Sequence, residues 1–160
     1  MTSHYTRGAS LSSEASREHI ERALMDYGAT DVCFSHDGSR SAIAFRADGR
    51  QFRLVVSLPE ADGTGPSAGD TALGAARGAK AKDFERATRR VWYALTLAID
   101  AKLGAAAAGI ATLESEFLAH VVLPGNRTVF DEIEPIIESA YRSGRYSSLG
   151  GSPPSPTVDR

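Results

Sequence analysis

The chain has few side chains whose type and spacing suit bond-making chemistry. Its one cysteine, Cys33, lies three residues before His36, and a nearby imidazole could activate the thiol as a nucleophile. The simpler interpretation is that Cys33 is an inert residue of a predicted strand. A single thiol excludes an internal disulfide and any site that needs two thiolates.

Acidic side chains of the C-terminal third are a second candidate for chemistry. Residues 113–138 hold six acids and one base, Arg127, and paired carboxylates can hold Mg²⁺ for phosphoryl chemistry. The six are Glu114, Glu116, Asp131, Glu132, Glu134 and Glu138. Solvated helix faces and helix N-termini account for the same pattern. Because no phosphate loop, dinucleotide fingerprint or zinc spacing is present, we expect no catalytic residue, metal or cofactor.

Basic residues gather in two other stretches, although the whole chain has a net charge of −2. Residues 40–53 hold four arginines against one aspartate, and residues 77–102 hold seven bases against three acids. Clustered cations can neutralise a phosphate backbone, and a nearby aromatic ring can stack on bases. The expected nucleic-acid-binding residues are Arg46, Arg53, Arg86, Arg89, Arg90 and Tyr93. Two alternatives stay open: the cations only solubilise the surface, or they meet the acidic third of another copy.

Length and composition indicate one folded domain. The chain has 160 residues, of which 42% are hydrophobic and 24% charged. No apolar run approaches the roughly 20 residues that span a bilayer, and the N-terminus has no apolar core of a secretory signal. We expect a cytoplasmic protein without membrane contact. We predict a flexible N-terminus over 1–12, one domain over 13–146 with a flexible loop at 59–80, and a disordered tail over 147–160.

The hydrophobic pattern predicts an α+β fold. Its expected order is a helix, a three-stranded antiparallel meander, a long helix packed on the sheet, and then C-terminal helices. Ser12 or Ser13 is the expected cap of the first helix, and Gly28 its end.

The meander contains the sharpest local prediction. Asp48-Gly49 favours a type I′ turn. A two-residue turn at this point places Phe45 opposite Phe52, and Ile43 opposite Leu54, on one apolar face.

The helical part after the meander is marked mainly by caps and breakers. The long helix is expected to begin near Asp83 and to end at Gly109. Thr112 caps a short helical turn after it. Pro135 inside the last helix predicts either a kink or a late start, and Gly144 is its expected end.

Three segments resemble a group of small phage and prophage proteins. They are residues 27–30 (YGAT), 89–103 and 116–124. The resemblance covers roughly residues 13–145 and implies a setting in replication and recombination, with no catalytic residues to carry over. Asp100 stands where those proteins usually have a basic residue, and Ala107-Ala108 where they have an acidic-apolar pair. Both departures weaken a basic stripe along the helix.

From these patterns we expect a non-enzymatic accessory protein of phage or mobile-element DNA metabolism. It would self-associate and bind single-stranded nucleic acid through phosphate contacts rather than base reading. The alternative is a protein-interaction module, an inhibitor or adaptor of a host factor, that binds no nucleic acid. Its interface would be the acidic third or the helix over 91–103, whose apolar surface makes it either central to the domain or a self-assembly contact.

Overall fold

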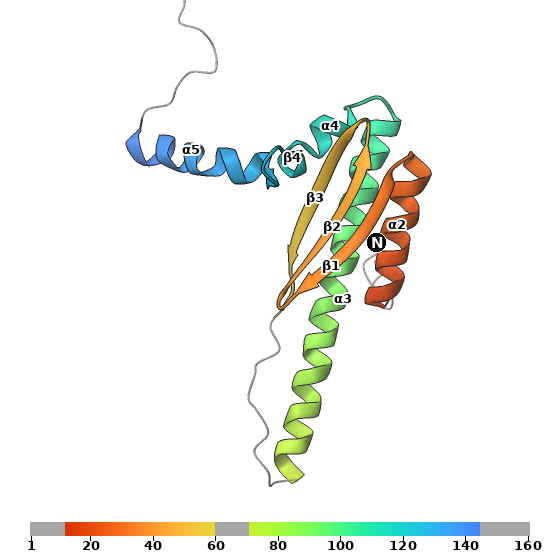
Figure 1. Cartoon of the computed structure of the whole chain (residues 1–160). Coiled ribbons are helices and arrows are strands. Elements are labelled where there is room, and N and C mark those ends of the chain that lie inside the picture. Colours follow the sequence, from red (N-terminus) through yellow and green to blue (C-terminus); the bar gives the residue numbers. More distant parts are fainter. Residues whose placement is uncertain (1–11, 60–70, 145–160) are drawn as a thin grey trace, which may run out of the picture.

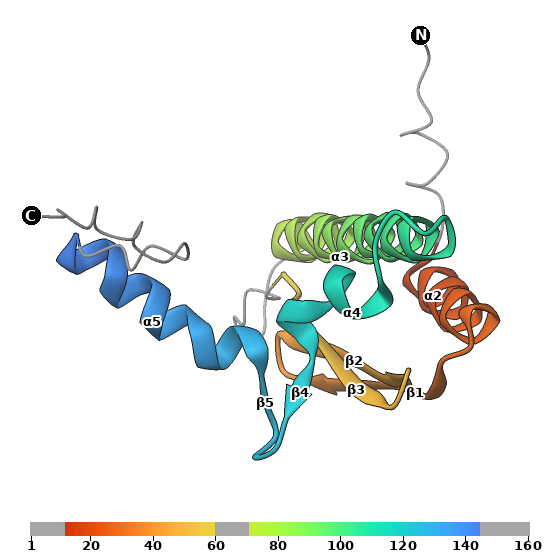
Figure 2. The same cartoon turned by 90° about the horizontal axis from the view of Figure 1, so that it is seen from above.

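The chain folds into two layers, in which two helices cover one face of a sheet (Figures 1 and 2). The computed structural model describes residues 12–59 and 71–144, with the backbone alone for 71–77. The first part contains α2 (Ser13–Tyr27), β1 (Thr30–Asp37), β2 (Arg40–Ala47) and β3 (Arg50–Ser57). The second contains α3 (Thr71–Ala107), α4 (Leu113–Glu116), the 3₁₀ turn η1 (Leu118–His120), β4 (Val122–Leu123), β5 (Arg127–Thr128) and α5 (Val129–Ser143). The predicted α+β fold class is confirmed.

The meander has the predicted register. Its strand order is β1-β2-β3, all antiparallel, with Phe45 opposite Phe52 and Ile43 opposite Leu54. Asp48 has φ 51° and Gly49 has φ 73°, as a type I′ turn requires of both central residues. A one-residue slip would turn every apolar side chain of β3 to the outer face, so this turn fixes which face is buried.

The core lies between the inner face of the sheet and the two helices. The sheet contributes Ile43, Phe45, Phe52 and Leu54; α2 contributes Ile20 and Leu24; α3 contributes Trp92, Ile99 and Leu103. The rings of Phe45 and Phe52 stack with centroids 5.0 Å apart, and Phe117 meets them edge-on at 5.7 and 6.0 Å. Because Phe117 directly follows α4, this ring cluster attaches the C-terminal segment to the sheet.

Caps and a polar pair fix α2. The Ser12 hydroxyl accepts a hydrogen bond from the Ala15 amide at 3.0 Å, and Gly28 closes the helix with φ 108°. Asp100 lies on α3 with its carboxylate 2.9 Å from Nε2 of His19 on α2. The acidic residue therefore serves helix-to-helix packing.

The long helix begins at Thr71 rather than near Asp83. The flexible loop predicted over 59–80 is therefore wrong for 71–80, and residues 60–70 lie outside the described parts. The cause is alanine, which is common in this stretch and is the best helix former. The 37 residues of α3 measure about 55 Å, against about 26 Å for a strand of 8 residues. Its first turns consequently extend beyond the sheet (Figure 1).

The C-terminal elements follow the predicted caps. Gly109 has φ 71° and ends α3, and Thr112 caps α4 through a capping box with Ser115. Val121, just before β4, pairs with Phe52 at the edge of β3. Gly144 ends α5 with φ 64°. The predicted N-terminal segment, apart from Ser12, and the predicted tail lie outside the described residues.

Removing the Phe117 ring should destabilise the whole fold. We expect Phe117→Ala to lower the free energy of unfolding by about 3–5 kcal/mol, because it leaves a cavity against two other rings. Urea denaturation followed by circular dichroism measures the loss. Leu118→Ala is the matched control, since Leu118 is 50% exposed; it should cost less than about 0.5 kcal/mol. Equal effects of the two variants would contradict the assigned role of Phe117.

Candidate functional site

The predicted nucleic-acid-binding residues fall on two separate surfaces. Arg46 and Arg53 are in β2 and β3, next to the buried Phe45 and Phe52, so they point to the outer face of the sheet. Arg86, Arg89, Arg90 and Tyr93 are on α3, which covers the inner face. The structure does not bring the two sets together.

Each arginine near the β2–β3 turn faces a carboxylate. Arg46 pairs with Asp31 at 3.6 Å, and Arg50 with Glu114 at 3.0 Å. The side chain of Arg53 is only 25% exposed and lies 3.8 Å from Asp131. These acids are distant in sequence from their partners, and they offset the positive charge that the sequence concentrates in residues 40–53.

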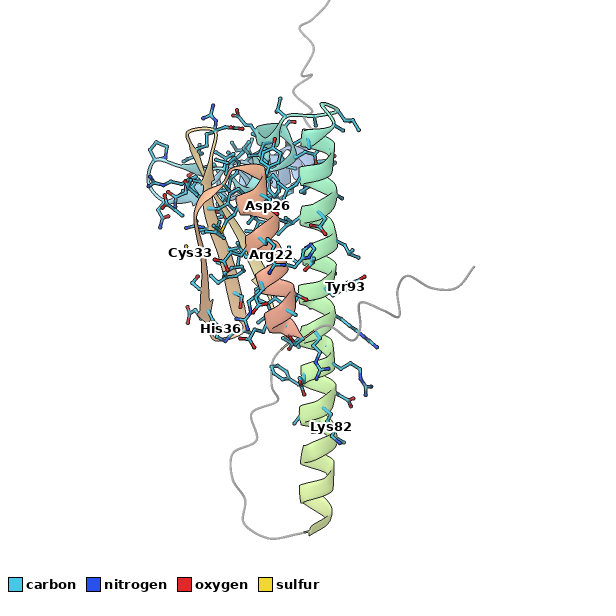
Figure 3. The ribbon with its side chains drawn as sticks, turned by 90° about the vertical axis from the view of Figure 1, so that its right-hand side faces the viewer. Arg22, Asp26, Cys33, His36, Lys82 and Tyr93 are labelled. Atoms are coloured by element: carbon cyan, nitrogen blue, oxygen red, sulfur yellow. The ribbon has the colours of Figure 1, made fainter. Side chains whose placement is uncertain are left out.

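The basic stretch of α3 is more accessible. Arg86 pairs with Asp83 at 3.6 Å and Arg89 with Glu85, both within the helix. The Arg86 side chain is 66% exposed and that of Arg89 36%. The exposed cations Lys80, Lys82 and Arg90 form no ion pair with any residue that the structure describes. Figure 3 shows Lys82 on the part of α3 that extends past the sheet, and Tyr93 further along the helix, beside α2.

The geometry separates Cys33 from His36. Cys33 pairs with Ala44 in the sheet and is exposed, whereas His36 pairs with Ser41 and places Nδ1 3.0 Å from the Ser41 hydroxyl. Residues three apart in a strand point to opposite faces, and their Cα atoms are about 10 Å apart. The two labelled side chains are accordingly well separated in Figure 3. Across residues 12–59 and 71–144, no three His, Cys, Asp or Glu side chains cluster as metal ligands would.

The most unusual surface belongs to α5, which projects from the body of the molecule (Figures 1 and 2). None of its side chains is buried, although its apolar residues recur at helical spacing on one side. Its large apolar side chains are 43 to 69% exposed: Phe130, Ile133, Ile136, Ile137 and Tyr141. We call these five residues the apolar face of α5.

Arg53 anchors the base of this projecting helix. Its Nη1 donates to the Asn126 side-chain oxygen at 2.9 Å, and its Nη2 donates to the Asn126 backbone carbonyl at 2.8 Å. Asn126 sits in the β4–β5 turn with φ 63°. The guanidinium therefore bridges β3 to that turn, which places it among structural contacts rather than on an open surface.

Two sets of hydrogen bonds stabilise the start of α5: a capping box, and an arginine that donates to a backbone carbonyl left without its helical partner. The Thr128 amide donates to Asp131 Oδ2 at 2.8 Å, and the Asp131 amide donates to the Thr128 hydroxyl at 3.2 Å. Pro135 has no N–H to donate to the Asp131 carbonyl, and Arg127 Nη2 donates to that carbonyl instead, at 2.7 Å. This replacement lets the helix run from Val129 through the proline.

Two titratable groups in this region are shifted. Hydrogen bonds from the Thr128 amide and hydroxyl hold the pKa of Asp131 below its ordinary value, with a smaller contribution from Arg53 and Arg127. Burial lowers the pKa of His120, and the nearby Lys102 ammonium lowers it further. Lys102 itself donates to the Glu116 carbonyl and lies 5.4 Å from the Phe117 ring, so it fastens α4 to α3.

Sequence reasoning located the last helix but not its exposure. Its apolar spacing is the same as that of a helix packed on a core, and nothing local distinguishes the two cases. The Arg53–Asn126 contact joins residues 73 positions apart, so no local sequence motif predicts it. Pro135 and Gly144 were local signals for the course of the helix, and neither bears on its exposure.

Comparisons with known proteins add no assignment. Neither protein families, curated proteins nor solved structures gave a match to this chain. Among the described helices, none combines the length and apolar character needed to cross a bilayer.

The Thr128–Asp131 capping box predicts how the stability of the fold changes at acid pH. Because the pKa of Asp131 is lower in the folded chain than in the unfolded chain, its ionised form stabilises the fold above the unfolded pKa. That contribution is lost as the pH falls through the lowered, folded pKa. Thr128→Ala should raise the pKa of Asp131 in an NMR titration and cost about 1 kcal/mol of unfolding free energy at neutral pH. Thr112→Ala, at the other capping box, should leave the pKa of Asp131 unchanged.

Proposed function

We propose that this chain is a non-enzymatic protein-interaction module whose contact element is α5. The observation that carries the proposal is a capped helix with a continuous apolar face and no buried side chain. Contiguous apolar surface of this kind marks binding sites in soluble proteins. An amphipathic helix typically binds by laying its apolar residues in a groove or on a helix face.

The way α5 is held supports this role. Arg53, Arg127 and the capping box fix the start of the helix. The main contacts of α5 are with η1 and β5, both at its base. The apolar face is thus presented outward at a defined angle. A setting in phage or mobile-element biology remains part of the proposal and rests on the sequence resemblance alone.

Site-specific photo-crosslinking in cells of the source organism tests the proposal. A photoreactive phenylalanine analogue at Ile136, 67% exposed on the apolar face, should give a discrete protein adduct. The same analogue at the exposed Ser139, on the polar side of α5, should give several-fold less adduct. Mass spectrometry identifies the adduct. Equal weak labelling from both positions would sink the proposal.

Nucleic-acid binding is the second candidate, now confined to α3. The observation that favours it is the basic start of the helix, where residues 78–90 carry five cations against two carboxylates and extend past the sheet. Such an extension could follow a phosphate backbone without reading bases. The sheet arginines support it less, because Arg46, Arg50 and Arg53 each face a carboxylate. On α3, Arg86 and Arg89 are also paired, but Lys80, Lys82 and Arg90 form no ion pair with a described residue.

Fluorescence anisotropy with labelled single-stranded oligonucleotides at two salt concentrations separates the two candidates. If α3 binds phosphates, replacing Arg86, Arg89 and Arg90 by Glu should abolish binding. Replacing one of the three arginines alone should weaken binding and reduce the salt slope by about 0.7. The control replaces Arg40, Arg46 and Arg50 by Glu, which is the same charge change on the sheet, and should leave most of the affinity. Absence of binding by the unaltered chain at low salt removes this candidate.

A further inference from the structure

We propose that α3 binds one single strand of nucleic acid along one side, over the part of the helix between Lys82 and Tyr93. The inference rests on nucleic-acid binding by α3, the second candidate function. It adds the side of the helix, a further binding residue, Lys82, and the form of the ligand. It follows from the direction of the cations around the helix and from the place where α2 covers the same side.

The cations between Lys82 and Arg90 point to one side of α3. The helix runs from Thr71 to Ala107, and successive residues turn by about 100°. On this spacing four cations and one aromatic ring fall within an arc of about 100°: Lys82, Arg86, Arg89, Arg90 and Tyr93. We call these five residues the basic side of α3. Lys80 does not belong to it, because it lies about 160° around the helix from Lys82.

The start of α2 limits the basic side at one end. Asp100 follows Tyr93 by seven residues, so it points to the same side of α3. There the helix is covered, because the Asp100 carboxylate pairs with His19 of α2 at 2.9 Å. Figure 3 shows Tyr93 beside α2, and Lys82 on the part of α3 that extends past the sheet. The uncovered stretch from Lys82 to Tyr93 is roughly 16 Å long.

The cations of the basic side are accessible to a ligand. Lys82 and Arg90 are exposed and form no ion pair with any residue of the described parts. Arg86 and Arg89 each pair with a carboxylate of the same helix. Both carboxylates lie outside the arc of the basic side. Ion pairs that are exposed to water contribute little to stability, so a phosphate can replace the carboxylate beside either arginine.

The spacing of the cations suits the backbone of a single strand. Lys82, Arg86 and Arg90 follow one another at four-residue steps, each of which is a rise of about 6 Å. Successive phosphates of one strand have a similar separation, so one phosphate can lie beside each cation. Tyr93 lies at the end of this row, where its ring can stack on an unpaired base. The bases of a duplex are already stacked and paired, so the arrangement favours a single strand.

Two matched lysine variants test the side of the helix. Fluorescence anisotropy measures binding of a short labelled oligothymidylate by the purified full chain at several salt concentrations. Lys82→Gln should weaken binding several-fold at low salt and reduce the salt slope by about 0.7. Lys80→Gln makes the same charge change nearby on the other side of α3, and should leave the affinity and the salt slope close to those of the unaltered chain.

A strand without bases tests the place of Tyr93. Tyr93→Leu should weaken binding of the oligothymidylate by about tenfold, because stacking on one base is lost. It should leave unchanged the binding of an abasic strand of the same length, which a misfolded variant would not do. The unaltered chain should bind the single strand more tightly than a duplex of the same length. Circular dichroism confirms that every variant is folded.

Three results would overturn the inference: equal losses in the two lysine variants, a duplex bound as tightly as the single strand, or equal weakening of both strands by Tyr93→Leu. Each of them keeps nucleic-acid binding by α3 as a candidate. Absence of binding by the unaltered chain at low salt rejects both the candidate and the inference. The role of α5 is judged separately, by the adduct at Ile136.

Discussion

The contact of the Phe117 ring with Phe45 and Phe52 is the constraint on which the remaining architecture depends. Phe45 and Phe52 face each other across the β2–β3 hairpin, whereas Phe117 comes from the segment after α4, which no local interaction would hold against the sheet. Burial of aromatic surface supplies the driving force, and the edge-on geometry selects one arrangement. Once Phe117 is seated, Val121 reaches the edge of β3, and the β4–β5 turn lies within reach of Arg53. The direction of α5 follows from that sequence of contacts.

Local sequence signals were sufficient to predict most helices and strands and many of the core residues. The Asp48-Gly49 turn determined the register of the hairpin, and serine, threonine and glycine caps located four helix ends, at Ser12, Gly28, Thr112 and Gly144. The start of α3 was missed because small residues are common both in loops and in helices. Alanine content should have outweighed glycine content in residues 71–80.

Long-range pairing explains why the site was harder to predict. The charge of residues 40–53 is offset by Asp31, Glu114 and Asp131, which only the fold brings near. Whether the apolar side of α5 is buried depends on the tertiary packing of the other elements. The sequence pattern indicates only that one side of the helix is apolar. The candidate surfaces therefore became visible when the positions of whole elements were known, not from any motif.

The proline in α5 has a consequence for the speed of association. Its ring restricts the unfolded chain, and the Arg127 contact removes the usual cost of placing it in a helix. With caps at both ends as well, the helix is shaped before any encounter, so docking does not wait for a coil to order. Rigid recognition of this kind lets contacts form at the rate of correctly oriented collisions, and the lifetime of a complex is then governed by how fast the apolar side chains separate.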